Sequence, residues 1–403
     1  MRASHRRLAG LALLAALFGA AVLVVYATFT RPFPGFNDYM TPWEAARSFF
    51  YDGLDPYSAQ TSLNIQQRLY GRPALPDEQP NHYAYPFYAL FVAWPLIHLD
   101  YAWATAVWLV LNGALLAGAL LLLLDFYGWR PRPLALAGLL LAALLAYPAA
   151  RGLLLGQVSH LVYFLQALAL WALARRRDRL AGLALAASTF KPQMGVFLIP
   201  FLLLWGLRAR RWPFVASFSA LFAALIALSF ALQPDWVAGF ADQLALYPTY
   251  IEVSTPAWVI AQSLLGLGRG AELALNAAGL ALLLWTWRAV LAQGRAERFW
   301  WTVMMTLTMT HLIGLRTATP HFVVLTIPLV FYLRGLAQAG RGWHAAALVA
   351  ALVALPWAHF LLTLGADKFE HPTLFLPLPL LALAALWLTR RRWWAAAVPA
   401  PPA

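Results

Sequence analysis

The sequence predicts an all-α polytopic membrane protein with about 12 transmembrane helices and a large first extracytoplasmic loop. Of its 403 residues, 62% are hydrophobic and only 11% are charged, whereas soluble domains typically carry about 25% charged residues. Apolar runs long enough to cross a bilayer recur along the whole chain. The basic residues gather at the ends of these runs, which is typical of a multi-pass membrane protein.

The first apolar run, Leu8–Phe29, has 22 residues without a charge and follows Arg2, Arg6 and Arg7. A helix needs about 20 apolar residues to cross a bilayer, and a signal-peptide core has only about 7–15. We therefore predict an uncleaved first helix with a cytoplasmic N-terminus.

Eleven further apolar stretches complete the predicted crossings. They are Ala102–Leu124, Leu134–Ala149, Val158–Ala174, Leu180–Phe190, Gln193–Leu207, Pro213–Leu232, Leu273–Trp287, Phe299–Leu315, Phe322–Leu333, Ala345–Leu364 and Thr373–Thr389. The two stretches on either side of Lys191 are short, and are either two crossings or one kinked element. Tyr85–Leu99 is also short and contains Pro86 and Pro95, so we expect a re-entrant or interfacial helix on the outer side.

Alternating crossings place 20 of the 29 Lys and Arg residues on the cytoplasmic side, with only Asp125, Asp178 and Glu297 of the 16 acidic residues. This distribution satisfies the positive-inside rule and predicts that both termini are cytoplasmic in a multi-pass protein of the cell membrane. The formal net charge of +13 is thereby explained by topology. Membrane lipids are expected partners, and no nucleic-acid partner is expected.

The outer side carries two long segments within a single integral membrane domain, residues 1–403. Residues 31–84 hold six acidic residues among tyrosines and form the expected catalytic loop, and residues 233–270 form a second outer loop. No nucleotide-binding glycine motif occurs. The absence of cysteine excludes disulfides, thiolate metal sites and a cysteine nucleophile.

Asp38 is the first candidate for chemistry, because a carboxylate just beyond the first helix can act as a general base toward a hydroxyl. The alternative is a helix cap, since Asp38 or Thr41 precedes a plausible helix start at Pro42.

Lys191 is the second candidate and one of only two lysines in the chain. An ammonium at a break between half-helices suits a phosphate oxygen, and the alternative is a lysine that snorkels at the interface.

Arg316 and His321 stand together before an outer helix start, where anions also bind. Their alternative roles are an ordinary loop charge and a capping histidine.

Gly156-Gln157 lies at an outer tip between helices and is a weak signal alone. Arg151 nearby is interpreted as a loop charge, and Asp55-Pro56-Tyr57 as a turn.

Taken together, one carboxylate and several cationic or amide groups are predicted at the outer face. This pattern suits a lipid-linked phosphate donor, because an anionic leaving group needs fixed positive charge where its charge develops. We expect no cofactor and assign no metal ligand, while the involvement of a divalent ion stays open.

Short segments spread over roughly residues 30 to 330 resemble glycosyltransferase family 87. Residues 38–47 (DYMTPWEAAR) and 52–57 (DGLDPY) are similar to its D-F-x-x-Y-x-x-A-R … G-x-D-P-Y run. Further similar segments are 83–86 (YAYP), 90–96 (LFVAWPL), 108–112 (WLVLN), 156–158 (GQV), 190–192 (FKP), 208–212 (RARRW) and 320–322 (PHF).

The resemblance implies a GT-C type fold and transfer of a sugar, usually mannose, from a polyprenyl-phosphate donor to a lipid or glycan acceptor at the outer leaflet. It implies that Asp38 is the base of an inverting reaction, and that Lys191 and His321 contact the donor phosphate. Arg316 joins them, and Gln157, Asp55, Tyr57 and Tyr85 are expected to bind substrate.

Departures from the family pattern concern the sugar and the acceptor more than the reaction. Pro42 replaces a common tyrosine, Phe87 a second proline, and Ser159 the usual asparagine. Two other hypotheses are a secondary transporter or flippase of a lipid-linked or anionic substrate, and a non-catalytic scaffold in which Asp38 only caps a helix. Transporters tend to place their key polar residues near the midplane, which argues against the first of these.

Overall fold

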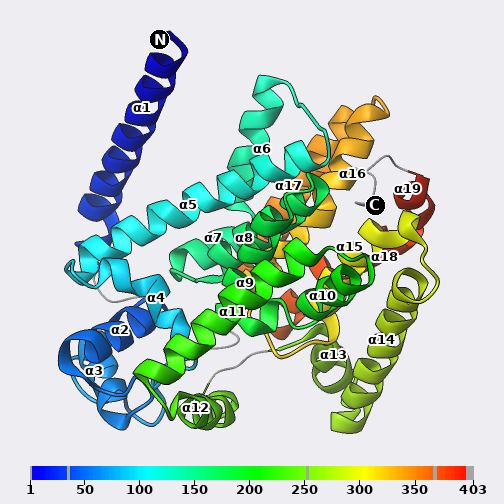
Figure 1. The fold of residues 1–403 in the computed structure, drawn as a ribbon. Helices are drawn as coiled ribbons and strands as arrows, with labels where there is room; N and C mark the ends of the chain where they lie inside the picture. The colour runs from blue at the N-terminus through cyan, green and yellow to red at the C-terminus, as the bar shows by residue number, and fades with distance from the viewer. Residues whose placement is uncertain (1, 34–36, 251–253, 366–369, 396–403) are drawn as a thin grey trace. The chain divides into compact units, whose positions relative to one another are not determined.

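A computed structural model describes residues 2–33, 37–250, 254–365 and 370–395 (Figure 1). Residues 34–36 of the first outer loop and 251–253 of the second therefore lie outside the described residues. The described chain is almost entirely helical and holds no strand, only an isolated antiparallel bridge between Ser254 and Thr317. The predicted all-α polytopic membrane fold is confirmed.

Among the described residues, six helices are long and apolar enough to cross a membrane. They are Ala9–Thr30, Tyr101–Phe126, Trp212–Leu232, Gly268–Leu291, Thr319–Gln338 and Gly342–Thr363. A seventh span results if Pro133–Leu145 and Tyr147–Leu154, which meet at 55°, are taken as one. Other predicted crossings form shorter helices, such as Leu198–Arg208 with 11 residues, too short to cross a bilayer alone at about 1.5 Å per residue. The number of twelve crossings stays a prediction.

The chain divides into two compact units. Unit 1 comprises residues 1–115, 153–157 and 228–251, and unit 2 comprises 116–152, 158–227 and 252–403. Unit 1 is built from α1 (Arg2–Val25), η1 (Tyr26–Thr30), α2 (Met40–Asp52), α3 (Ala59–Tyr70), η2 (Phe87–Ala89), α4 (Leu90–Ala93), η3 (Trp94–Leu96), the first part of α5 (Tyr101–Phe126), the end of α11 (Trp212–Leu232) and α12 (Trp236–Tyr250).

Unit 2 holds the remaining helices. They are α6 (Pro133–Leu145), α7 (Tyr147–Leu154), α8 (Ser159–Ala174), α9 (Asp178–Ala187), η4 (Ser188–Phe190), η5 (Pro192–Met194), α10 (Leu198–Arg208), α13 (Pro256–Trp258), η6 (Val259–Leu264), α14 (Gly268–Leu291), η7 (Ala296–Arg298), α15 (Phe299–Ile313), η8 (Thr319–Leu325), α16 (Thr326–Gln338), α17 (Gly342–Thr363), η9 (Pro372–Phe375), α18 (Pro377–Leu388) and α19 (Arg390–Ala395). Helices α5, α7 and α11 are each divided between the two units.

The segment predicted to be the first outer loop is a folded structure in which α2 and α3 pack together (Figure 1). Ser58 caps α3 by accepting a hydrogen bond from the Thr61 N–H at 3.2 Å. Between the two helices, Arg68 donates to the largely buried carboxylate of Glu44 at 3.1 Å. Burial raises the pKa of Glu44, and Arg68 opposes that shift. Residues 31–84, which the sequence shows only to be acidic and aromatic, thus contain a pair of packed helices.

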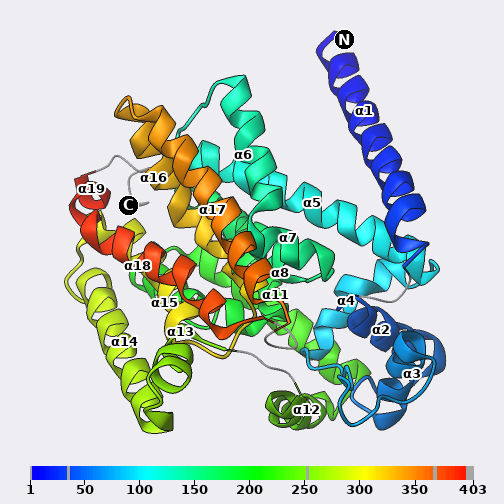
Figure 2. The same ribbon diagram turned by 180° about the vertical axis from the view of Figure 1, so that it is seen from behind.

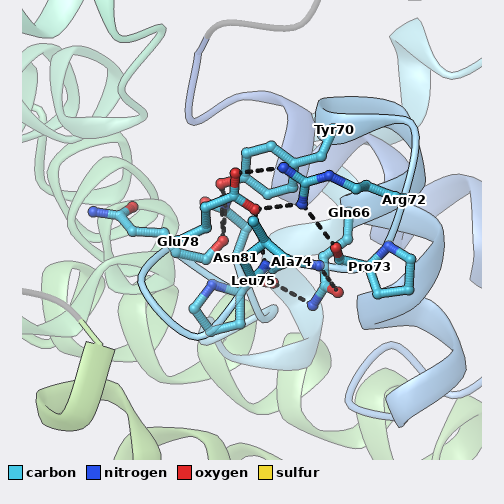
Figure 3. Close-up of polar contacts among 10 residues, drawn as sticks. Gln66, Tyr70, Arg72, Pro73, Ala74, Leu75, Glu78 and Asn81 are labelled. Carbon is cyan, nitrogen blue, oxygen red and sulfur yellow. Dashed lines mark hydrogen bonds and ion pairs between the residues drawn. The ribbon is translucent and has the colours of Figure 1, made fainter.

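After α3 the loop is closed by a bidentate ion pair (Figure 3). Arg72 contacts the two carboxylate oxygens of Glu78 at 2.6 and 2.8 Å, and Glu78 also accepts from the Leu75 N–H at 2.8 Å. Gln66 reaches from α3 to the same turn, where its amide oxygen accepts from the Ala74 N–H at 2.9 Å. These contacts fix the irregular segment that leads from α3 toward residue 83.

Unit 2 is organised around α15, whose residues Phe299 to Leu312 are all buried. Helices α10, α14 and α18 pack against it (Figures 1 and 2). Elsewhere in this unit α9 approaches α11 closely at Gly182, where a Cβ would collide with the carbonyl oxygen of Phe214. Small residues permit such close approach of helix backbones in membrane proteins.

Candidate functional site

Asp38 lies between the first helix and α2, in unit 1. Helix α2 begins at Met40 with Tyr39 in the N-cap position, so Asp38 stands one residue before that position and Thr41 lies inside the helix. The Asp38 N–H donates to the carbonyl oxygen of Leu155 at 2.8 Å. One carboxylate oxygen of Asp38 accepts a hydrogen bond from Nε2 of Gln157. The turn that follows α7, at residues 155–157, therefore holds both the backbone and the side chain of Asp38.

Gly156 explains why this turn can approach Asp38 so closely. Its φ of +61° lies in the left-handed region, and a Cβ would lie 2.9 Å from Oδ1 of Asn37. Trp108 of α5 fixes the turn from another direction by donating from Nε1 to the Gly156 carbonyl at 2.8 Å. The Gly156-Gln157 pair, a weak signal in the sequence, is thus the element that orients the candidate base.

Asn37 is a site residue that the sequence reasoning missed. Its Oδ1 accepts from the Tyr39 N–H at 3.1 Å and from the Tyr101 hydroxyl at 2.7 Å. Asn37 and Tyr101 also line a cavity of about 230 Å³ with Phe29, Phe33 and three other residues. An apolar cavity therefore begins one residue away from the candidate base.

Three predicted substrate-binding residues have different environments. Asp55 accepts from the Tyr57 N–H at 2.9 Å, which confirms the predicted turn, and the Tyr57 hydroxyl donates to the Tyr85 carbonyl at 2.9 Å. The ring of Tyr85 is half-buried and lies within Coulombic range of Asp38 and Tyr247. Burial raises the pKa of Tyr85, and Asp38 adds to the shift. At neutral pH its hydroxyl stays protonated and can donate a hydrogen bond near the carboxylate.

Lys191 lies in unit 2, in the break between η4 and η5 that the sequence predicts. Pro192 follows it and begins η5, a position that suits proline because the first N–H groups of a helix have no partner within it. Only 3% of Lys191 is exposed. A snorkelling lysine would keep its ammonium at the surface, so this burial argues against the interfacial alternative.

His321 is buried, like Lys191, and lies in the same unit. Its Nδ1 is hydrogen-bonded to the Thr317 hydroxyl, whose backbone forms the bridge to Ser254. Lys191, His311 and His160 all lie within Coulombic range of His321. His160, the second residue of α8, and His311, in the last turn of α15, are also buried, and sequence reasoning missed both because each belongs to an apolar helix.

Arg316 and Arg151 of the same unit differ in their environments, since Arg316 is exposed like an ordinary loop charge, whereas Arg151 lies in α7 and not in a loop. Arg316 is exposed and its guanidinium lies over the Trp258 ring at 5.9 Å. Arg151, interpreted as a loop charge, forms an ion pair with Glu370 at 3.4 Å. Glu370 also accepts from the Tyr147 hydroxyl at 2.5 Å and the Thr319 hydroxyl at 2.7 Å. This acidic residue, absent from the predicted site, anchors the first residue of η8, which carries His321.

The chemical character of the two groups is clear from these contacts. Unit 1 presents an oriented carboxylate beside phenolic and amide donors, which suits proton transfer from a hydroxyl. Unit 2 presents a buried ammonium with three imidazoles, which suits an anion. In the part of the chain that the structure describes, no three His, Asp or Glu side chains are placed to hold a metal ion.

The comparisons with known proteins add one finding. A family model described as Glycosyltransferase family 87 matches residues 83–313, more than half of the chain. The matched range includes Tyr85, Gln157, Lys191 and His311, whereas Asp38 precedes it and His321 follows it. No curated protein and no solved structure matches the chain.

Proposed function

Because the chain belongs to glycosyltransferase family 87 and is a membrane glycosyltransferase, we propose that it is a polyprenyl-phosphate-sugar-dependent hexosyltransferase. The sugar is most often mannose in the family that it resembles, and the acceptor is a lipid or a glycan. The reaction takes place at the extracytoplasmic face of the cell membrane, with both termini in the cytoplasm. The charge distribution along the chain supports this orientation.

Asp38 acts as the general base in this proposal. Its carboxylate takes the proton from the acceptor hydroxyl while the hydroxyl oxygen forms a bond to the anomeric carbon. The bond from that carbon to the phosphate oxygen breaks in the same displacement, so the configuration inverts and the transition state has oxocarbenium character. The observation that carries the proposal is the hydrogen bond from Gln157 to Asp38, which orients the carboxylate. Tyr85 and the turn Asp55–Tyr57 bind the substrate near this carboxylate.

The leaving polyprenyl phosphate takes the electron pair of the broken bond and needs compensation for its charge. Lys191 and His321 bind it, and their burial supports this role because electrostatic attraction is stronger away from water. Arg316 is assigned to the same anion. Its exposed position fits an initial contact with the phosphate at the surface better than a buried one.

The decisive experiment measures sugar transfer from polyprenyl-phosphate-mannose by the purified protein in lipid. Asp38→Asn removes the base and keeps the shape of the side chain, so turnover should fall about 10²–10⁴-fold with normal expression. Asp52→Asn is the matched control, because Asp52 is an exposed carboxylate at the end of α2 in the same unit. Activity retained in Asp38→Asn would remove Asp38 as the base.

A further inference from the structure

His311 is a buried histidine for which the structure of the described chain supplies no hydrogen bond. It lies in the last turn of α15, and only 1% of it is exposed. Neither Nδ1 nor Nε2 has a hydrogen-bond partner among the described residues, and the ring meets Phe322 edge-on at 5.9 Å. Buried polar side-chain atoms are hydrogen-bonded in the large majority of cases. A buried imidazole with both nitrogens unsatisfied therefore points to a ligand.

The groups around His311 indicate the charge of that ligand. His321, itself buried, lies within Coulombic range of His311, of His160 and of Lys191. Nδ1 of His321 is bonded to Thr317, which leaves its Nε2 as the nitrogen available to a ligand. Glu370, the carboxylate that bonds to Thr319 at the start of η8, is already engaged by Arg151, Tyr147 and Thr319.

A metal ion does not fit this group. Its ammonium is a donor without a lone pair, and no three metal-ligating side chains among the described residues are suitably placed. An anion with several oxygen atoms fits well, because Lys191 and each imidazole can supply one N–H to a different oxygen. A phosphate ester is the anion of that kind that the proposed reaction requires.

We propose that His311, together with His160, binds the phosphate group of the lipid-linked substrate beside Lys191 and His321. The inference rests on the proposed function for the nature of the substrate, and it adds two binding residues from inside apolar helices. His311 donates an N–H to a phosphate oxygen and so gains the hydrogen bond that it otherwise lacks. Burial of the imidazole without a partner costs stability in the ligand-free protein, and the hydrogen bond to the phosphate offsets that cost.

The test compares binding and stability in the purified full-length protein in lipid nanodiscs, with farnesyl phosphate as the probe. His311→Leu should weaken farnesyl phosphate binding at least roughly tenfold, as expected for loss of a hydrogen bond to a charged group. The same substitution should raise the melting temperature of the ligand-free protein, because it replaces an unsatisfied buried polar group by an apolar one. His311→Gln keeps an N–H donor and should recover part of the affinity.

Thr310→Val is the matched control. Thr310 precedes His311 in α15, is equally buried, and donates its hydroxyl hydrogen bond within the helix to the Thr306 carbonyl at 2.8 Å. Its substitution should leave farnesyl phosphate affinity unchanged. A purely structural His311 would give the opposite result, with a lower melting temperature in His311→Leu and unchanged affinity, and that outcome overturns the inference.

Two further probes, inorganic phosphate and farnesol, show whether the site recognises the phosphate group or the lipid chain. Competition by inorganic phosphate together with weak binding of farnesol supports a site for the phosphate group itself, whereas equal binding of farnesol and farnesyl phosphate overturns it. Failure of the wild type to bind either phosphate probe also overturns it. Binding that depends on His311 without any sugar transfer would overturn the proposed function alone. Transfer that depends on Asp38, with binding independent of His311, would overturn only this inference.

Discussion

Asp38 and Gln157 are 119 positions apart in the chain, and their hydrogen bond is the most informative contact of single residues in this protein. The Asp38 carboxylate accepts a hydrogen bond from the Gln157 amide, and the backbone N–H of Asp38 donates to Leu155. Together the two bonds restrict the orientation of the carboxylate. A general base works only within hydrogen-bond reach of the proton that it removes. The activity should therefore depend on the residue that orients Asp38 as well as on Asp38 itself.

Gln157→Leu tests this dependence. Loss of a hydrogen bond to a charged group has a net cost of about 1.5–3 kcal/mol, so turnover should fall roughly 10- to 100-fold while donor binding stays near the wild-type value. Steady-state kinetics with polyprenyl-phosphate-mannose measure both quantities. Gln60→Leu is the control, since Gln60 is exposed on α3 and bonds to Asn64 at 3.0 Å. Equal kinetics in wild type and Gln157→Leu would contradict the proposed orienting role.

Glu78 makes the first outer loop sensitive to acid. The hydrogen bonds from Arg72, and then the one from the Leu75 N–H, lower the pKa of Glu78 from 4.5 to about 2. Because folding lowers this pKa, the stabilisation is present above pH 4.5 and is lost as the pH falls toward 2. Hydrogen exchange of residues 72–78 should therefore accelerate across that interval, relative to the exchange rate of an unstructured peptide at the same pH. Glu78→Gln should show fast exchange of these residues already at neutral pH.

At the scale of elements, the chain uses interruptions of helices to place its polar groups. The turn after α7 carries Gln157, the break before η5 carries Lys191, and the 3₁₀ segment η8 carries His321. Regular apolar helices satisfy their backbone internally, whereas an interruption within a membrane protein must be supported by other protein groups. The interruptions are therefore both the weak points of the fold and the places where side chains are presented.

Gly156→Ala tests the first interruption. A left-handed conformation costs a residue with a Cβ about 1–2 kcal/mol, and the new Cβ would also collide with Asn37, the neighbour of Asp38. Thermal stability and turnover should both fall. Gly128→Ala is the control, because Gly128 has the same φ of +61° but no atom within 4 Å of its Cβ position. It should lose comparable stability from the backbone and keep its activity, and a loss of activity in both variants would contradict the local explanation.

At the scale of the whole molecule, the asymmetry of charge predicts how the chain crosses the membrane. The protein contains no cysteine, so single cysteines can report on each side without background. Leu75, 48% exposed, is predicted outside, and Trp343, 69% exposed, is predicted inside. In intact cells a membrane-impermeant maleimide should label Leu75→Cys and spare Trp343→Cys until the membrane is opened. The reverse pattern would contradict the predicted orientation and the extracytoplasmic site.

Much of this protein could be predicted from local patterns in its sequence. Hydropathy and charge indicate an all-α membrane fold, because the cost of exposing backbone or charge to lipid acts on each segment separately. Turn chemistry indicates the turn Asp55–Tyr57, and Pro192 indicates the break after Lys191. The family resemblance assigns Lys191 and His321 to one donor-phosphate site, which stays a prediction, and the structure buries both residues in the same unit.

Only the tertiary structure decided which side chains share an environment. Two contacts join segments far apart in the chain: the bond between Gln157 and Asp38, and the ion pair between Arg151 and Glu370. A third, the contact of His311 with Phe322, joins two consecutive helical segments, α15 and η8. Arg316 is exposed although it stands only five residues before His321. His160 is more than 150 residues away in the chain and yet lies within Coulombic range of His321. Hydropathy and spacing describe one segment at a time. The packing of helices against one another determines which polar groups meet, so the histidines could be recognised only in the folded chain.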